Sequence, residues 1–203
     1  MNVLLIGSGA IISAFLMSAG ITCMKKIDNK HGLPENVGVF YILVTAIAGG
    51  ITTEAFYPYF FLSIFFTAYL AIMAYTDFYT MKLYTIFHII AALTGYIALF
   101  HFKWSIWEFT LGFGLIFFMQ LAKVISIGDV ELLFASFPYC CIFAQIYKID
   151  ELYFYFIFLI VIMVISIIIN FKAFIKKGKT KAPFAVPMFI GYVAIALFMI
   201  RTK

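Results

Sequence analysis

Long apolar stretches alternate with short polar connections along the whole chain. Each stretch is close to the roughly 20 residues that a helix needs to cross the hydrocarbon core of a bilayer. The pattern predicts helices at 3–24, 37–53, 59–76, 83–101, 106–122, 130–147, 152–171 and 184–200. We therefore expect an all-α, polytopic membrane bundle of about eight transmembrane helices, with residues 1–203 forming a single membrane-embedded domain.

Composition supports this interpretation. Of the 203 residues, 66% are hydrophobic and only 11% are charged. A soluble domain could not bury so much apolar surface, so the composition excludes a soluble protein. The cysteines Cys23, Cys140 and Cys141 lie in or at the ends of apolar stretches and lack a metal-binding spacing. We expect them to be small core residues without a disulfide framework.

Basic residues predict the direction of the helices in the membrane. With the N-terminus outside, ten of the 14 Lys and Arg residues fall in cytoplasmic connections and four fall outside. This positive-inside bias selects an N-out, C-out topology. The cytoplasmic residues are Lys25, Lys26, Lys30, Lys82, Lys123, Lys172, Lys176, Lys177, Lys179 and Lys181, and the outer residues are Lys103, Lys148, Arg201 and Lys203.

Two aspartates stand where a chain of this composition should have none. Asp77 follows the third predicted helix and Asp129 directly precedes the sixth, so the topology puts both at the cytoplasmic face. A carboxylate at the edge of a bilayer is costly and is usually kept for a function. Two carboxylates that approach each other cannot both ionise easily, so one holds a proton while the other accepts one. An aspartic protease uses this arrangement to activate water, and Asp77 and Asp129 are our candidate catalytic pair.

The flanking helices indicate separate roles for the two aspartates. Asp77 lies near a helix C-terminus, where the helix dipole disfavours negative charge, whereas Asp129 lies near a helix N-terminus, where the dipole favours it. We therefore hypothesise that Asp77 starts protonated and that Asp129 is the general base. The opposing interpretation is that each aspartate is a helix cap or a solvated loop residue, as we expect for Asp28 and Asp150.

Three segments resemble one family of membrane peptidases. Residues 126–135, Ser-Ile-Gly-Asp-Val-Glu-Leu-Leu-Phe-Ala, are similar to the G-x-G-D-x-K-L-x-x-A element of the type IV prepilin leader peptidases, which are GxGD-type intramembrane aspartic peptidases. Residues 74–85, Ala-Tyr-Thr-Asp-Phe-Tyr-Thr-Met-Lys-Leu-Tyr-Thr, resemble that family's first aspartate element, A-x-x-D-x-x-x-x-x-I-P-N. Residues 183–187, Pro-Phe-Ala-Val-Pro, resemble the P-F-x-P-type stretch that opens its last helix. The segments occur in the family's order, and the resemblance spans the whole chain.

The chain departs from the family pattern at four of these positions. Ser126 replaces the first Gly of the motif, Glu131 stands where Lys is common, and Tyr84 and Thr85 replace Pro-Asn. Serine is the mildest replacement for glycine, so we expect it to be tolerated. Glu131 lies roughly 200° around a helix from Asp129, so we expect it to point away from the partner aspartate. The connection at 25–36 is short and has no paired Cys motifs, which resembles the peptidase-only members without the cytoplasmic insertion.

The resemblance implies an activity and a location. The expected protein is a membrane aspartic endopeptidase of the bacterial cytoplasmic membrane that cleaves the basic leader from type IV prepilin-like or pseudopilin substrates at the cytoplasmic face. Asp77 and Asp129 would activate water, and Gly128 would let backbone or substrate approach. The expected partners are a substrate with a basic leader and an apolar helix, and membrane lipid. We expect no cofactor, no metal and no nucleic acid.

Two other functions remain open from the sequence. The first is a catalytically weak scaffold subunit of a pilus-like machine, which the departures at Ser126 and Glu131 favour. The second is a small proton-coupled membrane carrier, in which the carboxylates relay protons. A carrier predicts polar residues along a path across the membrane, and the apolar stretches offer few besides Gln120 and Asn170.

Overall fold

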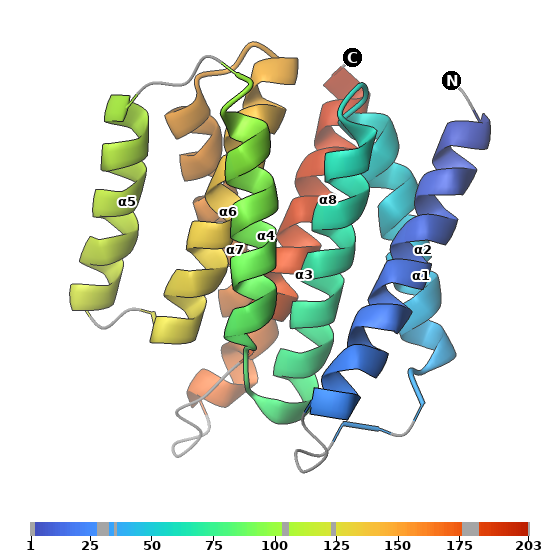
Figure 1. The fold of residues 1–203 in the computed structure, drawn as a ribbon. Coiled ribbons are helices and arrows are strands. Elements are labelled where there is room, and N and C mark those ends of the chain that lie inside the picture. The colour runs from blue at the N-terminus through green and yellow to red at the C-terminus, as the bar shows by residue number, and fades with distance from the viewer. Residues whose placement is uncertain are drawn as a thin grey trace. The chain divides into compact units, whose positions relative to one another are not determined.

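The computed structural model describes residues 3–27, 33–34, 36–102, 106–122, 125–175 and 183–202. Within these ranges the chain is helical and forms no strand (Figure 1). The helices are α1 (Val3–Ile27), α2 (Val39–Ala55), α3 (Phe60–Thr80), α4 (Thr85–Leu99), α5 (Ile106–Leu121), α6 (Ile127–Ile146), α7 (Glu151–Ile175) and α8 (Ala185–Thr202). Each helix coincides with one predicted apolar stretch, so the all-α prediction is confirmed for the described residues.

Two helix ends that matter for the site differ from the prediction. Helix α3 continues to Thr80, so Asp77 lies inside its last turn rather than after it. Helix α6 begins at Ile127 instead of residue 130, because Ser126 caps it, and Asp129 therefore lies in its first turn. Both aspartates are helical residues.

Within the described part of the chain, five helices are long and apolar enough to cross a membrane: α1, α3, α6, α7 and α8. Helices α2, α4 and α5 are apolar but shorter. Large apolar side chains such as Leu4, Phe15, Phe61 and Ile168 are exposed on the helices, which is the surface that a bilayer covers and that water does not. The chain is therefore a helical membrane protein, while the full number of crossings and the N-out, C-out orientation stay predictions.

Much of the charge that predicts the orientation lies outside the described residues. The residues concerned are Lys30, Lys103, Lys123, Lys176, Lys177, Lys179, Lys181 and Lys203, and Asp28, expected to be a cap or a solvated residue, lies outside them as well. Lys25, Lys26, Lys82, Lys148 and Arg201 are among the residues that the structure describes.

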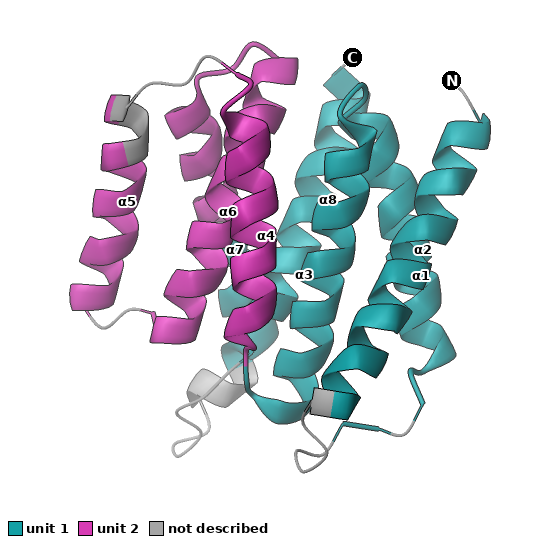
Figure 2. Ribbon diagram, in the orientation of Figure 1, with its two compact units in different colours: residues 1–82, 162–203 teal, residues 83–161 magenta. Residues whose placement is uncertain are grey.

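The chain divides into two compact units (Figure 2). Unit 1 comprises Met1–Lys82 and Ile162–Lys203, and unit 2 comprises Leu83–Val161. Unit 1 contains Asp77, and unit 2 contains Asp129. That both units serve one peptidase domain over residues 1–203 stays a prediction.

Unit 1 is built on close contact between α1 and α2, with α3 and α8 packed against them. A Cβ atom added at Gly9 would collide with the side chain of Thr53, and one added at Gly49 would collide with that of Ser13. These small residues therefore allow the two helices to approach closely, as in other membrane helix pairs. Helix α3 is the most enclosed part of this unit, since its side chains are buried almost continuously from Thr67 to Asp77.

Unit 2 is organised around α6, against which α4 and α5 pack. The middle of α6 is fully buried and includes Leu133, Phe137 and Tyr139. Tyr139 donates a hydrogen bond of 2.9 Å from its hydroxyl to the carbonyl of Ala91 in α4. Asp129 and Glu131 lie in the first two turns of α6, and the hydrogen bond from Thr85 to Glu131 connects the second of these carboxylates to α4.

Candidate active site

Asp77 occupies the last turn of α3 and is 6% exposed. Helix α3 ends at Met81, a left-handed residue (φ 53°) whose N–H donates to the Asp77 carbonyl at 2.9 Å. The side chain turns to another helix: the backbone N–H of Ala185 donates to Asp77 Oδ2 at 2.9 Å. Ala185 is the first residue of α8 and belongs to the Pro183–Pro187 segment. The structure thus connects residues 74–85 to residues 183–187, the first and third of the segments in the sequence resemblance.

This contact changes the electrostatic argument for Asp77. The first N–H groups of a helix have no partner within the helix, and its N-terminus carries partial positive charge. The Asp77 carboxylate satisfies one of these N–H groups on α8. The dipole at the C-terminus of α3 is therefore not the only helix dipole that acts on Asp77, and it gives no sufficient reason to place the proton on this residue.

Asp129 is the third residue of α6 and forms a reciprocal cap with Ser126. The Ser126 hydroxyl donates to Asp129 Oδ2 at 2.7 Å, and the Ser126 N–H donates to the same oxygen at 2.9 Å. The Asp129 N–H in turn donates to Ser126 Oγ at 3.3 Å. Each aspartate therefore accepts a hydrogen bond from the backbone at the start of a helix, and helix capping accounts for both carboxylates structurally.

The contact of Ser126 with Asp129 is a feature of the candidate site that was not predicted from the sequence. The signal was present, because a Ser followed three residues later by an acidic residue is typical of such a cap. Ser126 has φ −81° and ψ 167°, an extended conformation that any residue adopts. Nothing in this conformation requires glycine, and the expectation that the motif tolerates serine stays a prediction.

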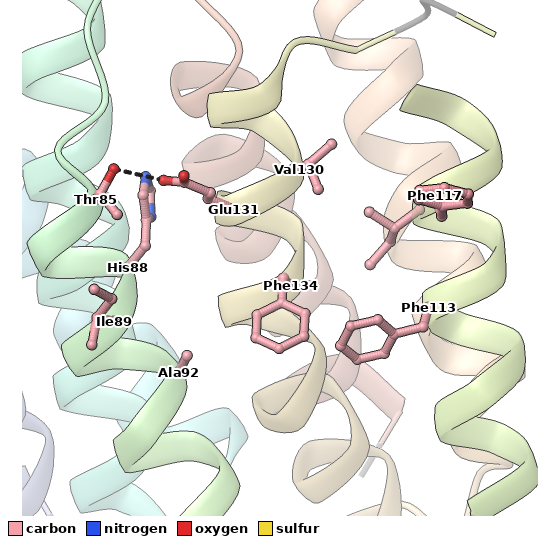
Figure 3. Close-up of a pocket in the computed structure, with 10 residues that line it drawn as sticks. Thr85, His88, Ile89, Ala92, Phe113, Phe117, Val130, Glu131 and Phe134 are labelled. Atoms are coloured by element: carbon pink, nitrogen blue, oxygen red, sulfur yellow. Dashed lines mark hydrogen bonds between the residues drawn. The ribbon is translucent and has the colours of Figure 1, made fainter. Parts of the chain in front are cut away.

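Two departures from the family pattern meet in unit 2. The Thr85 hydroxyl donates to Glu131 Oε2 at 3.0 Å (Figure 3). Thr85 is the first residue of α4, and Glu131 lies in the second turn of α6. The side chain of Glu131 is therefore directed toward α4 and is fixed there by a neutral donor.

A cavity of about 410 Å³ lies beside this pair, between α4, α5 and α6 (Figure 3). Its walls are almost entirely apolar, and its polar groups come from Thr85, His88 and Glu131. The full lining is Thr85, His88, Ile89, Ala92, Phe113, Ile116, Phe117, Val130, Glu131 and Phe134. All of these residues belong to unit 2.

The described residues offer no cluster of three or more His, Cys, Asp or Glu side chains that could hold a metal ion. The cysteines are free thiols: Cys23 is exposed, and Cys140 and Cys141 are buried in α6. The carboxylates of Asp77 and Asp129 can transfer protons, and the neighbouring hydroxyl and backbone N–H groups can donate hydrogen bonds.

Comparisons of the chain with family models, with curated proteins and with solved structures found no match. The resemblance to prepilin leader peptidases accordingly depends on the three segments themselves. The structure connects Asp77 to Ala185 and Asp129 to Ser126, each within one unit.

Proposed function

We propose that this chain is a membrane aspartic endopeptidase that removes the basic leader from prepilin-like or pseudopilin substrates. In this proposal eight helices cross the bacterial cytoplasmic membrane, both termini lie outside, and cleavage takes place at the cytoplasmic face. The observation that carries the proposal is the bond from Ala185 to Asp77. It brings two segments of the family pattern into contact around a buried carboxylate, although they lie 108 residues apart.

The proposed reaction uses Asp77 and Asp129 as one pair. One ionised carboxylate takes a proton from a water molecule as the water oxygen attacks the carbonyl carbon of the scissile bond. The other carboxyl group, which holds the shared proton, donates it toward the carbonyl oxygen, and the leaving amine is protonated when the C–N bond breaks. Since the contacts that Ser126 makes with the Asp129 carboxylate go to Oδ2, its Oδ1 is directed to no hydrogen-bond partner among the described residues and suits contact with water.

The competing account is that both aspartates are only helix caps, as expected for a scaffold subunit. Asp150 offers a matched control, because its Oδ1 accepts the N–H of Tyr153 at 2.8 Å and so caps α7 in the same way. Co-expression with a prepilin-like substrate, read by the size of the substrate on a gel, compares Asp77→Asn, Asp129→Asn and Asp150→Asn. A peptidase loses cleavage in the first two variants and keeps it in the third, with all three still inserted in the membrane. A scaffold shows no difference among them.

In the carrier interpretation, the buried hydroxyls of unit 1 would line a path for a proton or another cation. Thr45, Thr67 and Thr76 each donate to a carbonyl of their own helix, and Thr52 pairs with Thr67 at 2.7 Å. Such bonds satisfy the hydroxyl protons within unit 1 and are the usual arrangement of threonine in an apolar helix, so they are expected without any transport function.

A further inference from the structure

The cavity of unit 2 has mostly apolar walls, and Glu131 is the acidic side chain in its lining. Ile89, Phe113 and Phe134 contribute to its walls, and Glu131 stands at one end beside Thr85 (Figure 3). His88 is buried, and its imidazole reaches toward the same end. An occupant that matches this arrangement has a long apolar body and one group that interacts well with a carboxylate.

The carboxylate of Glu131 is positioned but not neutralised by the described part of the chain. Its Oε2 accepts from Thr85 at 3.0 Å, and Thr85 is uncharged. No Lys or Arg among the described residues forms an ion pair with Glu131. A carboxylate at the rim of an apolar cavity gains strongly from a cation, because the surrounding low dielectric strengthens their attraction.

Lysine and arginine side chains have this combination of properties. Their methylene stems cover apolar surface while the charged end meets a polar group. Glu131 is two residues from Asp129 on α6, a rise of roughly 3 Å and a rotation of roughly 200° about the helix axis. The cavity therefore lies around the start of α6 from Asp129, and the side chain that reaches it has to belong to a residue some positions away from the scissile bond.

On the basis of the proposed peptidase function, we propose that this cavity is a subsite for a lysine or arginine side chain of the substrate's leader, with Glu131 binding the cationic end. Thr85 is then a positioning residue that orients the carboxylate. The departures Thr85 and Glu131 would act together in substrate selection, and neither would take part in water activation.

Binding of synthetic peptides tests this subsite without requiring cleavage. The full-length protein is reconstituted in phosphatidylcholine vesicles, and its affinity is measured for a fluorescent peptide with a lysine-containing leader and for a matched peptide with norleucine at the lysine positions. We expect wild type to prefer the lysine peptide by roughly tenfold, the scale of one charge-assisted hydrogen bond. Glu131→Gln, which keeps an acceptor for Thr85, should remove this preference.

Two further variants separate the subsite from general effects of substitution. Glu151→Gln alters another glutamate of unit 2 that accepts a neutral donor, from Gln145 Nε2 at 3.0 Å, and should keep the preference. Ala92→Phe places a large ring in the cavity and should weaken binding of the lysine peptide. Equal affinity of wild type for both peptides, or an unchanged preference in Glu131→Gln, would overturn the subsite.

The same preparations distinguish this inference from the function on which it rests. Cleavage that depends on Asp129 but not on the leader's charge would leave the peptidase intact and overturn only the subsite. If adding phosphatidylethanolamine displaces the lysine peptide from wild type but not from Glu131→Gln, the occupant is the lipid amine and the leader proposal is wrong. Retained preference in the presence of that lipid supports the leader side chain.

Discussion

The N–H of Ala185, at the start of α8, donates to Asp77 Oδ2, at the end of α3. The two residues lie 108 positions apart in the sequence and belong to unit 1. The bond ties the last turn of one helix to the first turn of another, and it holds the Asp77 carboxylate in one orientation. In the proposed enzyme this bond both stabilises the fold and prepares the carboxylate for chemistry.

Separating these two roles gives the first prediction. Asp77→Ala leaves the buried N–H of Ala185 without its acceptor, so we expect a loss of about 1–3 kcal/mol in the free energy of unfolding. Asp77→Asn keeps a side-chain oxygen as acceptor and should lose less than about 1 kcal/mol. Unfolding of the purified variants in detergent measures both values. Equal stability of Asp77→Ala and wild type would show that the bond contributes nothing.

Ser126 leads to a second prediction, because its hydroxyl holds Asp129. Ser126→Ala removes the cap of α6 and should cost about 1 kcal/mol, whereas Ser126→Gly should cost only a few tenths. We expect Ser126→Gly, which restores the residue of the family pattern, to retain leader cleavage. Thermal unfolding and a cleavage assay on the same two proteins provide the comparison. Complete loss of cleavage in the glycine variant would mean that the hydroxyl itself is required.

A substitution at Gly128 tests whether glycine is needed there to leave space for a substrate or is required by the fold. A Cβ atom at Gly128 would lie 3.4 Å from Leu83 Cδ1, which is an ordinary contact. Because alanine favours helix more than glycine does, Gly128→Ala should be as stable as wild type or more so, by up to about 1 kcal/mol. If substrate approaches the backbone here, the same variant should cleave at least roughly tenfold more slowly. Normal cleavage would exclude this role for Gly128.

The close contact of α1 and α2 predicts unequal effects at two glycines of α1. Gly9→Ala forces a collision with Thr53, so we expect a loss of about 1–3 kcal/mol in stability. Gly7→Ala has nothing within 4 Å of the new Cβ and should be neutral or slightly stabilising. The two unfolding midpoints in the same detergent provide the measurement. Similar midpoints for both variants would contradict the packing of α1 on α2.

The sequence predicted the helices well, because each consists of one long apolar stretch between polar connections. The predicted start of α6 at residue 130 is three residues too late, because the apolar pattern alone does not show that Ser126 caps the helix and that Asp129 lies in its first turn. The partner of Asp77 could not be predicted, because no local pattern links Asp77 to a backbone N–H of a distant helix. The hydrogen bond between Thr85 and Glu131 could not be predicted for the same reason. From the sequence these two residues are separate departures from the family pattern, and only the fold shows that they are in contact.

Asp77 and Asp129 have to come together if they act on one water molecule, and disulfide formation between these two positions measures whether they do. Asp77→Cys and Asp129→Cys are combined in a chain that also carries Cys23→Ser, Cys140→Ala and Cys141→Ala. Two cysteines can be bridged only where their Cα atoms come within about 7 Å. The positive control combines Thr52→Cys with Thr67→Cys, whose hydroxyls lie 2.7 Å apart in the structure.

The account predicts an intramolecular bridge between positions 77 and 129 on mild oxidation in membranes, with or without a prepilin-like substrate. It also predicts a bridge between positions 52 and 67, which shows that the oxidant reaches the interior. A bridge in the threonine pair together with none in the aspartate pair, in both the presence and the absence of substrate, would contradict the proposed catalytic pair.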